Sequence, residues 1–162
     1  MKPNNARLLV VDDSSSIREV IREVLQDVGI TTIDEAADGA AGLEAFQRTA
    51  YDVVVTDWHM PRLDGIGLLK AIRASLERRD TPVVVLTGDV TPRRVVEAIE
   101  AGANGFIAKP FVTPALPEKL LRIIASLSPV TDFTPGLRLL GGSMRALTTQ
   151  VGLRRLSRPP AS

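Results

Sequence analysis

The 162-residue sequence contains no cysteine and a single histidine, His59. These shortages exclude disulfide bonds and leave no cluster of thiolates or imidazoles for a zinc site. Long apolar runs are also missing. The first run, Leu8–Val11, is too short for a signal peptide, and no stretch approaches the ~18 residues of a membrane span. We therefore expect a cytoplasmic protein without a membrane partner.

Net charge is small as well, at +1, so the total charge does not indicate a nucleic-acid partner. Its distribution divides the chain, because residues 129–162 hold five arginines and one acid, Asp132, whereas the preceding residues are acidic overall. The length fits one domain of ordinary size with an extension. We predict a domain over residues 1–127, followed by a linker and a basic tail over residues 128–162.

What the sequence does contain is a regular alternation of short apolar segments and longer amphipathic ones. The apolar segments are rich in valine and leucine, which suits strands buried on both faces of a parallel sheet. We predict strands at Leu8–Val11, Thr31–Ala36, Val53–Val55, Val83–Leu86 and Phe106–Ala108. Helices are expected over Ile17–Val28, Gly39–Arg48, Gly65–Ala74, Pro92–Ala101 and Pro114–Leu127, with N-cap candidates at Ser14–Ser16 and stops at Gly29 and Gly102. Five successive strand–helix pairs predict an α/β fold, a doubly wound five-stranded parallel sheet flanked by five helices.

Polar residues follow four of the predicted strands. Asp12 and Asp13 come after the first strand, Asp57 after the third, Thr87 after the fourth and Lys109 after the fifth. Because ligands of such sheets bind at the carboxyl ends of the strands, we expect these side chains to converge. Each residue alone is a weak signal, since paired aspartates often cap a helix and a lysine before proline is commonly exposed. Their shared position at strand ends is the evidence for a site.

Three neighbouring carboxylates repel one another, so the predicted site needs either bound protons or a cation. Carboxylate oxygens favour a hard dication, and Mg²⁺ suits a shallow site with few protein ligands. Lys109 adds a positive charge that pairs with a carboxylate at rest and with an anion when one arrives. Thr87 is able to donate a hydrogen bond to the same anion. A carboxylate in this setting is equipped to act as a nucleophile and form an acyl phosphate.

Four segments, LLVVDDSSSIREVI, VVVTDWHMPRLDGIGLLKAIR, PVVVLTG and AGANGFIAKPF, closely resemble the receiver domains of response regulators, the CheY-like family. The resemblance runs from about Arg7 to Leu127. It implies the strand order 2-1-3-4-5 and a sensor histidine kinase or phosphotransfer protein as the phosphoryl donor. It also implies that the chain is not an enzyme for an external substrate. It would catalyse only its own phosphorylation and dephosphorylation and would switch its binding surface for a downstream protein target.

The resemblance assigns a role to each residue of the predicted site. Asp57 would be the phosphoacceptor, Lys109 would bind the phosphoryl group, and Gly88 would leave access unobstructed. The Mg²⁺ ligands would be Asp13, Asp57 and the backbone carbonyl of His59, with Asp12 as a further ligand that binds directly or through water. On phosphorylation Thr87 would move toward the phosphoryl group and Phe106 would rotate inward, which would change the surface of the fourth helix, fifth strand and fifth helix. The bond between Lys109 and Pro110 would be a candidate for the cis isomer.

Two of these positions keep alternative interpretations. Phe106, where many family members have tyrosine, is either a switch residue or an ordinary core residue of an edge strand. The side chain of His59 either influences the attack of water on the acyl phosphate or faces solvent without a kinetic role.

The nearest rival function is an Mg²⁺-dependent, aspartate-nucleophile phosphatase of the haloacid dehalogenase type. Such enzymes need a second aspartate two residues after the nucleophile, where this chain has His59, and they need a cap domain for the substrate. Nucleotide binding is disfavoured because neither G-x-G-x-x-G nor a P-loop follows a strand. A receiver that works without phosphorylation is disfavoured by the intact set of acids.

The tail carries weaker signals. Pro129, Pro135 and Gly136 predict a linker. Apolar residues then recur at helical spacing, at Leu140, Met144, Leu147 and Val151, which predicts at most one short helix. This is too little for a DNA-binding helix-turn-helix output domain. Two interpretations stay open: a disordered or loosely packed appendage, or a segment that docks on the receiver or on a second subunit of a homodimer.

Overall fold

The structure is a computed structural model that describes residues 5–109 and 115–127. The predicted linker and tail, the Lys109–Pro110 bond and the predicted helix start at Pro114 lie outside these residues. The five strands are β1 (Arg7–Val11), β2 (Thr32–Ala36), β3 (Val53–Asp57), β4 (Val83–Thr87) and β5 (Gly105–Ala108). The five helices are α1 (Ser15–Asp27), α2 (Gly39–Arg48), α3 (Gly65–Ala74), α4 (Pro92–Glu100) and α5 (Ala115–Leu127).

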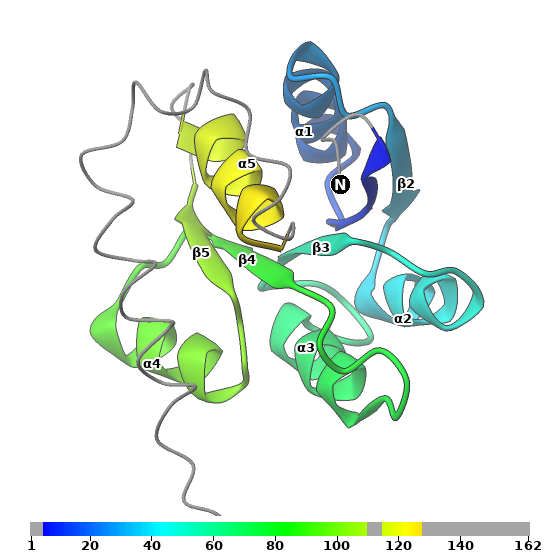
Figure 1. Ribbon diagram of the computed structural model, residues 1–162. Coiled ribbons are helices and arrows are strands. Elements are labelled where there is room, and N and C mark those ends of the chain that lie inside the picture. The colour runs from blue at the N-terminus through cyan, green and yellow to red at the C-terminus, as the bar shows by residue number, and fades with distance from the viewer. Residues whose placement is uncertain (1–4, 110–114, 128–162) are drawn as a thin grey trace, which may run out of the picture. The chain divides into compact units, whose positions relative to one another are not determined.

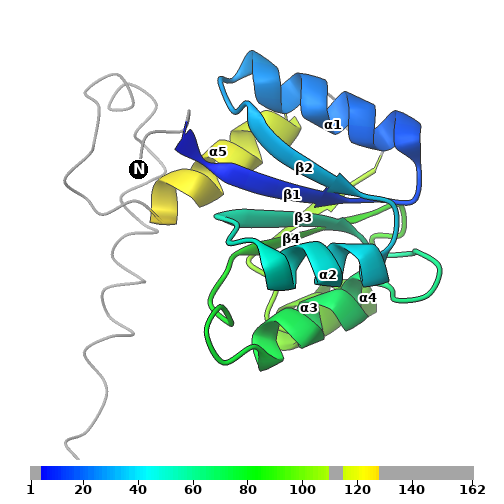
Figure 2. The same ribbon diagram turned by 90° about the vertical axis from the view of Figure 1, so that its right-hand side faces the viewer.

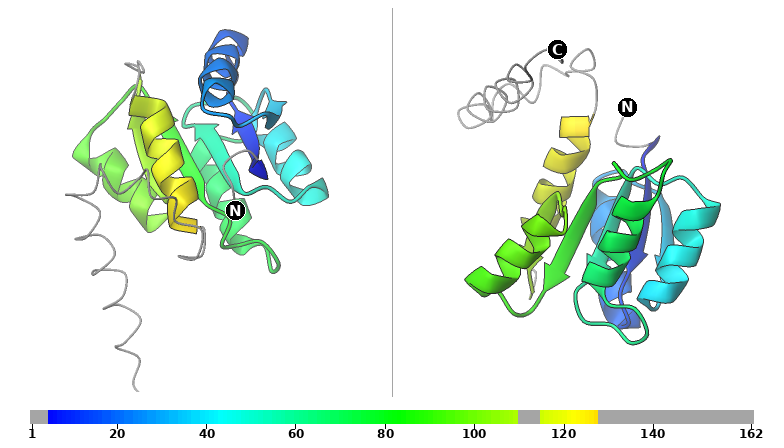
Figure 3. Two further views of the ribbon diagram at one scale, coloured as in Figure 1. Left: turned by 45° about the horizontal axis from the view of Figure 1, so that its top comes forward. Right: turned by 90° about the horizontal axis from the view of Figure 1, so that it is seen from below.

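The strands form one parallel sheet in the order β2-β1-β3-β4-β5, so the predicted fold class and strand order are confirmed. Helices α1 and α5 cover one face of this sheet and α2, α3 and α4 cover the other, as Figures 1 and 2 show. Two further views show the same division (Figure 3). Inner strands of a sheet that is covered on both faces are buried, which explains why β3 and β4 are buried at every position.

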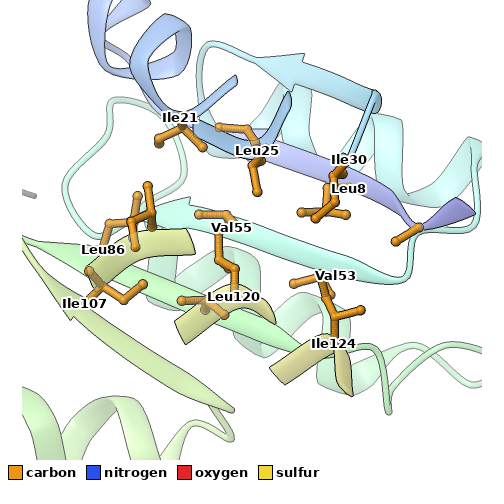
Figure 4. Close-up of a cluster of buried hydrophobic side chains, with 14 residues drawn as sticks. Leu8, Ile21, Leu25, Ile30, Val53, Val55, Leu86, Ile107, Leu120 and Ile124 are labelled. Carbon is orange, nitrogen blue, oxygen red and sulfur yellow. The ribbon is translucent and has the colours of Figure 1, made fainter. Parts of the chain in front are cut away.

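Each face of the sheet has its own hydrophobic core. The first core, beneath α1 and α5, joins alternate strand residues to side chains from both helices, among them Ile21, Leu25, Leu120 and Ile124 (Figure 4). The second core, beneath α2, α3 and α4, contains Phe46, Trp58, Ile72 and Ala98 together with the other strand residues. The alternation of side chains along each strand therefore decides which core a residue joins.

Local signals set the ends of the helices. The Ser14 side chain accepts a hydrogen bond from the backbone of Ile17 and caps α1, as the sequence predicted. Gly29 and Gly102 have positive φ, of 87° and 95°, which accounts for the predicted stops after α1 and α4. Several boundaries differ from prediction by one or two residues. The differences that concern the polar strand ends are in β3 and β4, which extend further than predicted, so that Asp57 and Thr87 are the last residues of their strands. The ladder continues there because Asp57 pairs with Leu86 and Thr87 with Ala108 in register.

Within residues 5–109 and 115–127, no helix combines the length and the hydropathy of a membrane span.

Candidate functional site

Asp12, Asp57 and Lys109 meet at the carboxyl edge of the sheet, on the face covered by α1 and α5. In each of the three strands concerned, the residue two positions earlier belongs to the core beneath those helices. Since strand side chains alternate, the same face is presented again two residues later. The convergence expected from the sequence is therefore a consequence of strand period and parallel register.

Lys109 links two of the carboxylates. Its Nζ donates to Asp12 Oδ2 at 2.8 Å and lies 3.1 Å from Asp57 Oδ1. Its backbone N–H donates to the Thr87 carbonyl at 2.7 Å, so the root of the side chain is fixed to β4. The Lys109 side chain is only one-fifth exposed. The sequence predicted that Lys109 pairs with a carboxylate at rest but did not identify it. In the structure Lys109 contacts both Asp12 and Asp57.

The aspartates differ in burial. Asp12 is fully buried, and its Oδ1 accepts the backbone N–H of Ser14 at 2.9 Å. Asp57 is 8% exposed, and its Oδ1 accepts the backbone N–H of Trp58 at 2.9 Å. Asp13, by contrast, is exposed. Together the three supply carboxylate oxygens that lie within 4.8 Å of one another.

The surroundings in this cluster disfavour the charged form of Asp57 and favour the charged form of Lys109. Burial and, after it, the charge of Asp12 raise the pKa of Asp57, although Lys109 and the Trp58 N–H act in the opposite direction. Burial lowers the pKa of Lys109, but the hydrogen bond and charge of Asp12, followed by Asp57, outweigh it and raise that pKa overall. The lysine is therefore charged at neutral pH, and the cluster as a whole still has more negative charge than positive.

The three carboxylates fit a hard dication. They offer oxygen ligands only, one of them on an exposed residue, and their shared negative charge exceeds what one lysine neutralises. His59, two residues past Asp57, has an exposed side chain. The predicted contact of its backbone carbonyl with the metal stays a prediction.

Thr87 and Phe106, the predicted switch residues, belong to the opposite face. The alternation of β4 directs Thr87 to the side of Val83 and Val85, in the core beneath α2, α3 and α4, and Phe106 is partly buried against the same core. The Thr87 hydroxyl is engaged with Asp89: it accepts the Asp89 N–H at 3.1 Å and donates to the Asp89 carbonyl at 3.3 Å. In this state, therefore, the hydroxyl is bonded to the loop after β4.

Sequence reasoning missed one group of residues around the site. Trp58 follows Asp57, is 2% exposed, and packs beneath α4. The guanidinium of Arg94 in α4 lies 4.9 Å from the centroid of the Trp58 ring, and Arg94 Nε lies 3.4 Å from Asp89 Oδ2. No local pattern marks Arg94, because basic residues are ordinary on the outer face of a helix.

Comparison with known proteins agrees with this geometry. The sequence profile of the response regulator receiver domain matches residues 8–121. The chain belongs to this family. The receiver is 42% identical over 123 residues to the chemotaxis protein CheY-3 of Vibrio cholerae, a match that covers 76% of this chain and 95% of that protein. It is therefore a CheY-like receiver, as the sequence motifs predicted.

Solved structures share its fold. The chemotaxis response regulator CheY4 of Vibrio cholerae matches the receiver with a TM-score of 0.69 and 36% identity, over 73% of this chain and 98% of that one. The receiver domain of a sensor histidine kinase from Pseudomonas aeruginosa matches with a TM-score of 0.65 and 29% identity, over 75% of this chain and 95% of that one. The latter was solved with a magnesium ion coordinated in its active-site cleft.

Proposed function

We propose that this receiver accepts a phosphoryl group on Asp57 from a sensor histidine kinase or a phosphotransfer protein, in a reaction that requires Mg²⁺. The observation that carries the proposal is the meeting of Asp12, Asp13 and Asp57 within 4.8 Å, with the Lys109 ammonium bridging two of them. A metal-binding neighbour of the same fold supports the assignment of the cation.

Asp57 is the carboxylate best suited to be the acceptor. It lies at the end of the central strand β3, and only Oδ1 takes part in the described bonds to Trp58 and Lys109, which leaves Oδ2 for reaction. An oxygen of Asp57 forms a bond to the phosphorus of the donor. The bond from phosphorus to the donor's leaving group breaks, and its electron pair departs with the leaving group. Attack of water on the resulting acyl phosphate releases inorganic phosphate and restores the carboxylate.

Lys109 would exchange partners in this reaction. At rest its ammonium neutralises part of the charge of Asp12 and Asp57, and on phosphorylation it would bind an oxygen of the incoming group. Asp12, Asp13 and Asp57, with the backbone carbonyl of His59, are the residues that would hold Mg²⁺. When bound, the ion supplies positive charge that offsets the phosphoryl oxygens in a cluster otherwise rich in anions.

Phosphorylation of Asp57 would be transmitted through Thr87 and Phe106, which lie on the other face of the sheet. Thr87 would release Asp89 and donate to the phosphoryl group, and Phe106 would turn inward, so that α4, β5 and α5 change their surface. Helix α4 has two exposed apolar side chains for a protein target, Val96 and Ile99, at 52% and 65% exposure.

The chain would turn over no external substrate and would catalyse only its own phosphorylation and dephosphorylation. A phosphatase of the haloacid dehalogenase type is the alternative, and an assay with an aryl phosphate separates the two. We expect at most stoichiometric release of the phenol in the presence of Mg²⁺. Sustained release over many equivalents would favour the enzyme.

Intact-mass spectrometry after incubation with acetyl phosphate tests the acceptor. We expect one added phosphoryl group with Mg²⁺ and none with a chelator. Asp57→Asn should remove the label, whereas Asp52→Asn, a change on a neighbouring aspartate in the loop before β3, should retain it. Undiminished labelling of Asp57→Asn would contradict the proposal.

A further inference from the structure

Arg94 joins the end of β3 to the loop after β4. The guanidinium of this third residue of α4 lies over the Trp58 ring at 4.9 Å, and its Nε contacts Asp89 Oδ2 at 3.4 Å. The Arg94 side chain is 28% exposed, and that of Asp89 is 54% exposed. A half-buried cation thus bridges a buried ring and a carboxylate in an exposed loop.

Trp58, against which this cation packs, is held in place by its own contacts. The backbone N–H of Trp58 donates both to Asp57 Oδ1 and to the Leu86 carbonyl, each at 2.9 Å. The side chain is 2% exposed and packs in the core that includes Ala98 of α4. The residue that positions Arg94 is therefore the immediate sequence neighbour of Asp57, the proposed phosphoacceptor.

The loop that Arg94 holds is short and exposed. Residues 88–91 connect β4 to α4, and all four are exposed. Within this loop, Asp89 makes both backbone hydrogen bonds to the Thr87 hydroxyl. Holding the Asp89 side chain consequently also holds the Thr87 hydroxyl away from Asp57.

We propose that Arg94 is a positioning residue that stabilises the resting loop, in which Thr87 is bonded to Asp89. It thereby opposes the release of the Thr87 hydroxyl toward a phosphoryl group on Asp57. This inference rests on the proposed function, because it concerns the residue through which the phosphoryl group would be sensed. Arg94 acts through Asp89 and Thr87 and does not touch the reacting atoms.

The direction of the effect follows from linkage. A ligand that requires the released loop binds more tightly when the resting loop is less stable. Loss of one cation–π contact and one partly exposed ion pair should shift that equilibrium about three- to tenfold. Removal of a positive charge by itself would act in the opposite direction, since it weakens the attraction for an anion.

Binding of beryllium fluoride in the presence of Mg²⁺ is a suitable measurement, because this anion adds to a carboxylate as a phosphoryl mimic. Trp58 is the only tryptophan of the chain, so its fluorescence reports on the site. The midpoint of the titration does not depend on the amplitude of the fluorescence change, so variants with different amplitudes can be compared. The variants are Arg94→Gln, Arg94→Lys and the matched control Arg93→Gln, which removes an exposed arginine from the same helical turn.

We expect Arg94→Gln to lower the midpoint about three- to tenfold, with Arg94→Lys between it and the wild type, since an ammonium keeps the charge but stacks less well. Arg93→Gln should leave the midpoint within about twofold of the wild type, as an exposed charge contributes little. An Arg94→Gln midpoint that is unchanged or raised, or an equal shift in Arg93→Gln, would overturn the role of Arg94. A wild-type chain that binds no beryllium fluoride would overturn the proposed function and this inference with it.

Discussion

Replacing Asp57 by asparagine should stabilise the protein when no divalent cation is present. The Asp57 carboxylate is almost fully buried and faces Asp12, which is completely buried. Burial and the charge of Asp12 raise the pKa of Asp57 from its ordinary value of 3.8, which means that the folded state disfavours the ionised form. Asparagine keeps the shape of the side chain and an oxygen that accepts the Trp58 N–H, but it removes the negative charge.

The sign of the pH dependence follows from the same shift. Because the pKa is higher in the folded state than in the unfolded state, the wild-type free energy of unfolding falls as pH rises above 3.8 through the folded value. At pH values above the pKa of Asp57 in the folded state, this decrease in the free energy of unfolding is complete. The advantage of Asp57→Asn should therefore be full at neutral pH and should vanish below pH 3.8, where the wild-type carboxyl group is protonated in both states.

The expected gain at neutral pH is about 1 kcal/mol, within the ~0.5–2 kcal/mol typical of relieving one unfavourable interaction. For a domain of this size it corresponds to a rise in Tm of about 3–6 °C. Added Mg²⁺ should reverse the order, because a ligand at 100 times its Kd stabilises the native state by about 2.7 kcal/mol. The variant has lost one of the three carboxylates and should gain much less.

Thermal unfolding followed by circular dichroism, with chelator and with Mg²⁺, measures both effects. Glu23→Gln is a matched control, since it removes one negative charge from an exposed position of α1 and should change Tm little. If Asp57→Asn is less stable than the wild type in chelator, the Lys109 contact outweighs repulsion and burial, and the reasoning is refuted.

Four further variants test contacts of the site and of the surrounding fold. Lys109→Met leaves two facing carboxylates without their cation, so it should lower the free energy of unfolding by about 2 kcal/mol in chelator, as measured in urea, and an unchanged value would argue against the bridge. Gly65→Ala would place a Cβ against the Asp57 backbone carbonyl and should cost more than about 2 kcal/mol, whereas Gly88→Ala meets open space and should be neutral or stabilising by up to about 1 kcal/mol. Arg73→Met removes a guanidinium that donates to three backbone carbonyls and one side-chain amide oxygen, and should cost about 3 kcal/mol by urea unfolding; a loss below 1 kcal/mol would contradict that count.

Much of the fold follows from patterns that act locally. Valine-rich runs predict strands buried on both faces, and glycines with positive φ end two helices where the sequence placed the stops. The strand order came from the resemblance to receivers, because period and composition do not order parallel strands. Strand ends were predicted short, since polar Asp57 and Thr87 look like loop residues although the ladder satisfies their backbone groups.

The convergence of the site was also predictable, but its internal pairing was not. Parallel register brings strand ends together whatever their sequence, so Asp12, Asp57 and Lys109 were expected to meet. Sequence gives no means of telling that Asp12 is buried and Asp13 exposed, or that the Thr87 hydroxyl turns to Asp89. These details depend on the paths of loops, where a change in one dihedral angle redirects a side chain.

Contacts between distant elements were the least predictable feature. The contact between Arg94 and Trp58 joins residues 36 positions apart, and neither residue type predicts a contact with the other. Arg73 similarly ties α3 to the loop before β5 by reaching the carbonyl of Gly102 and the side chain of Asn104. From the sequence, an arginine on a helix is expected to be a solvated charge. Only the packed structure shows whether its guanidinium donates hydrogen bonds to other elements.

We propose that Asp57 is the nucleophile of a site built from carboxylates of separate strands and one lysine. Reduction of an acyl phosphate with borohydride converts the modified aspartate to homoserine, which peptide mass spectrometry can assign to one position. After incubation with acetyl phosphate and Mg²⁺, we predict homoserine at position 57 alone, and none when a chelator replaces the metal. Homoserine at position 12 or 13 in place of 57, or equal conversion without Mg²⁺, would contradict the account.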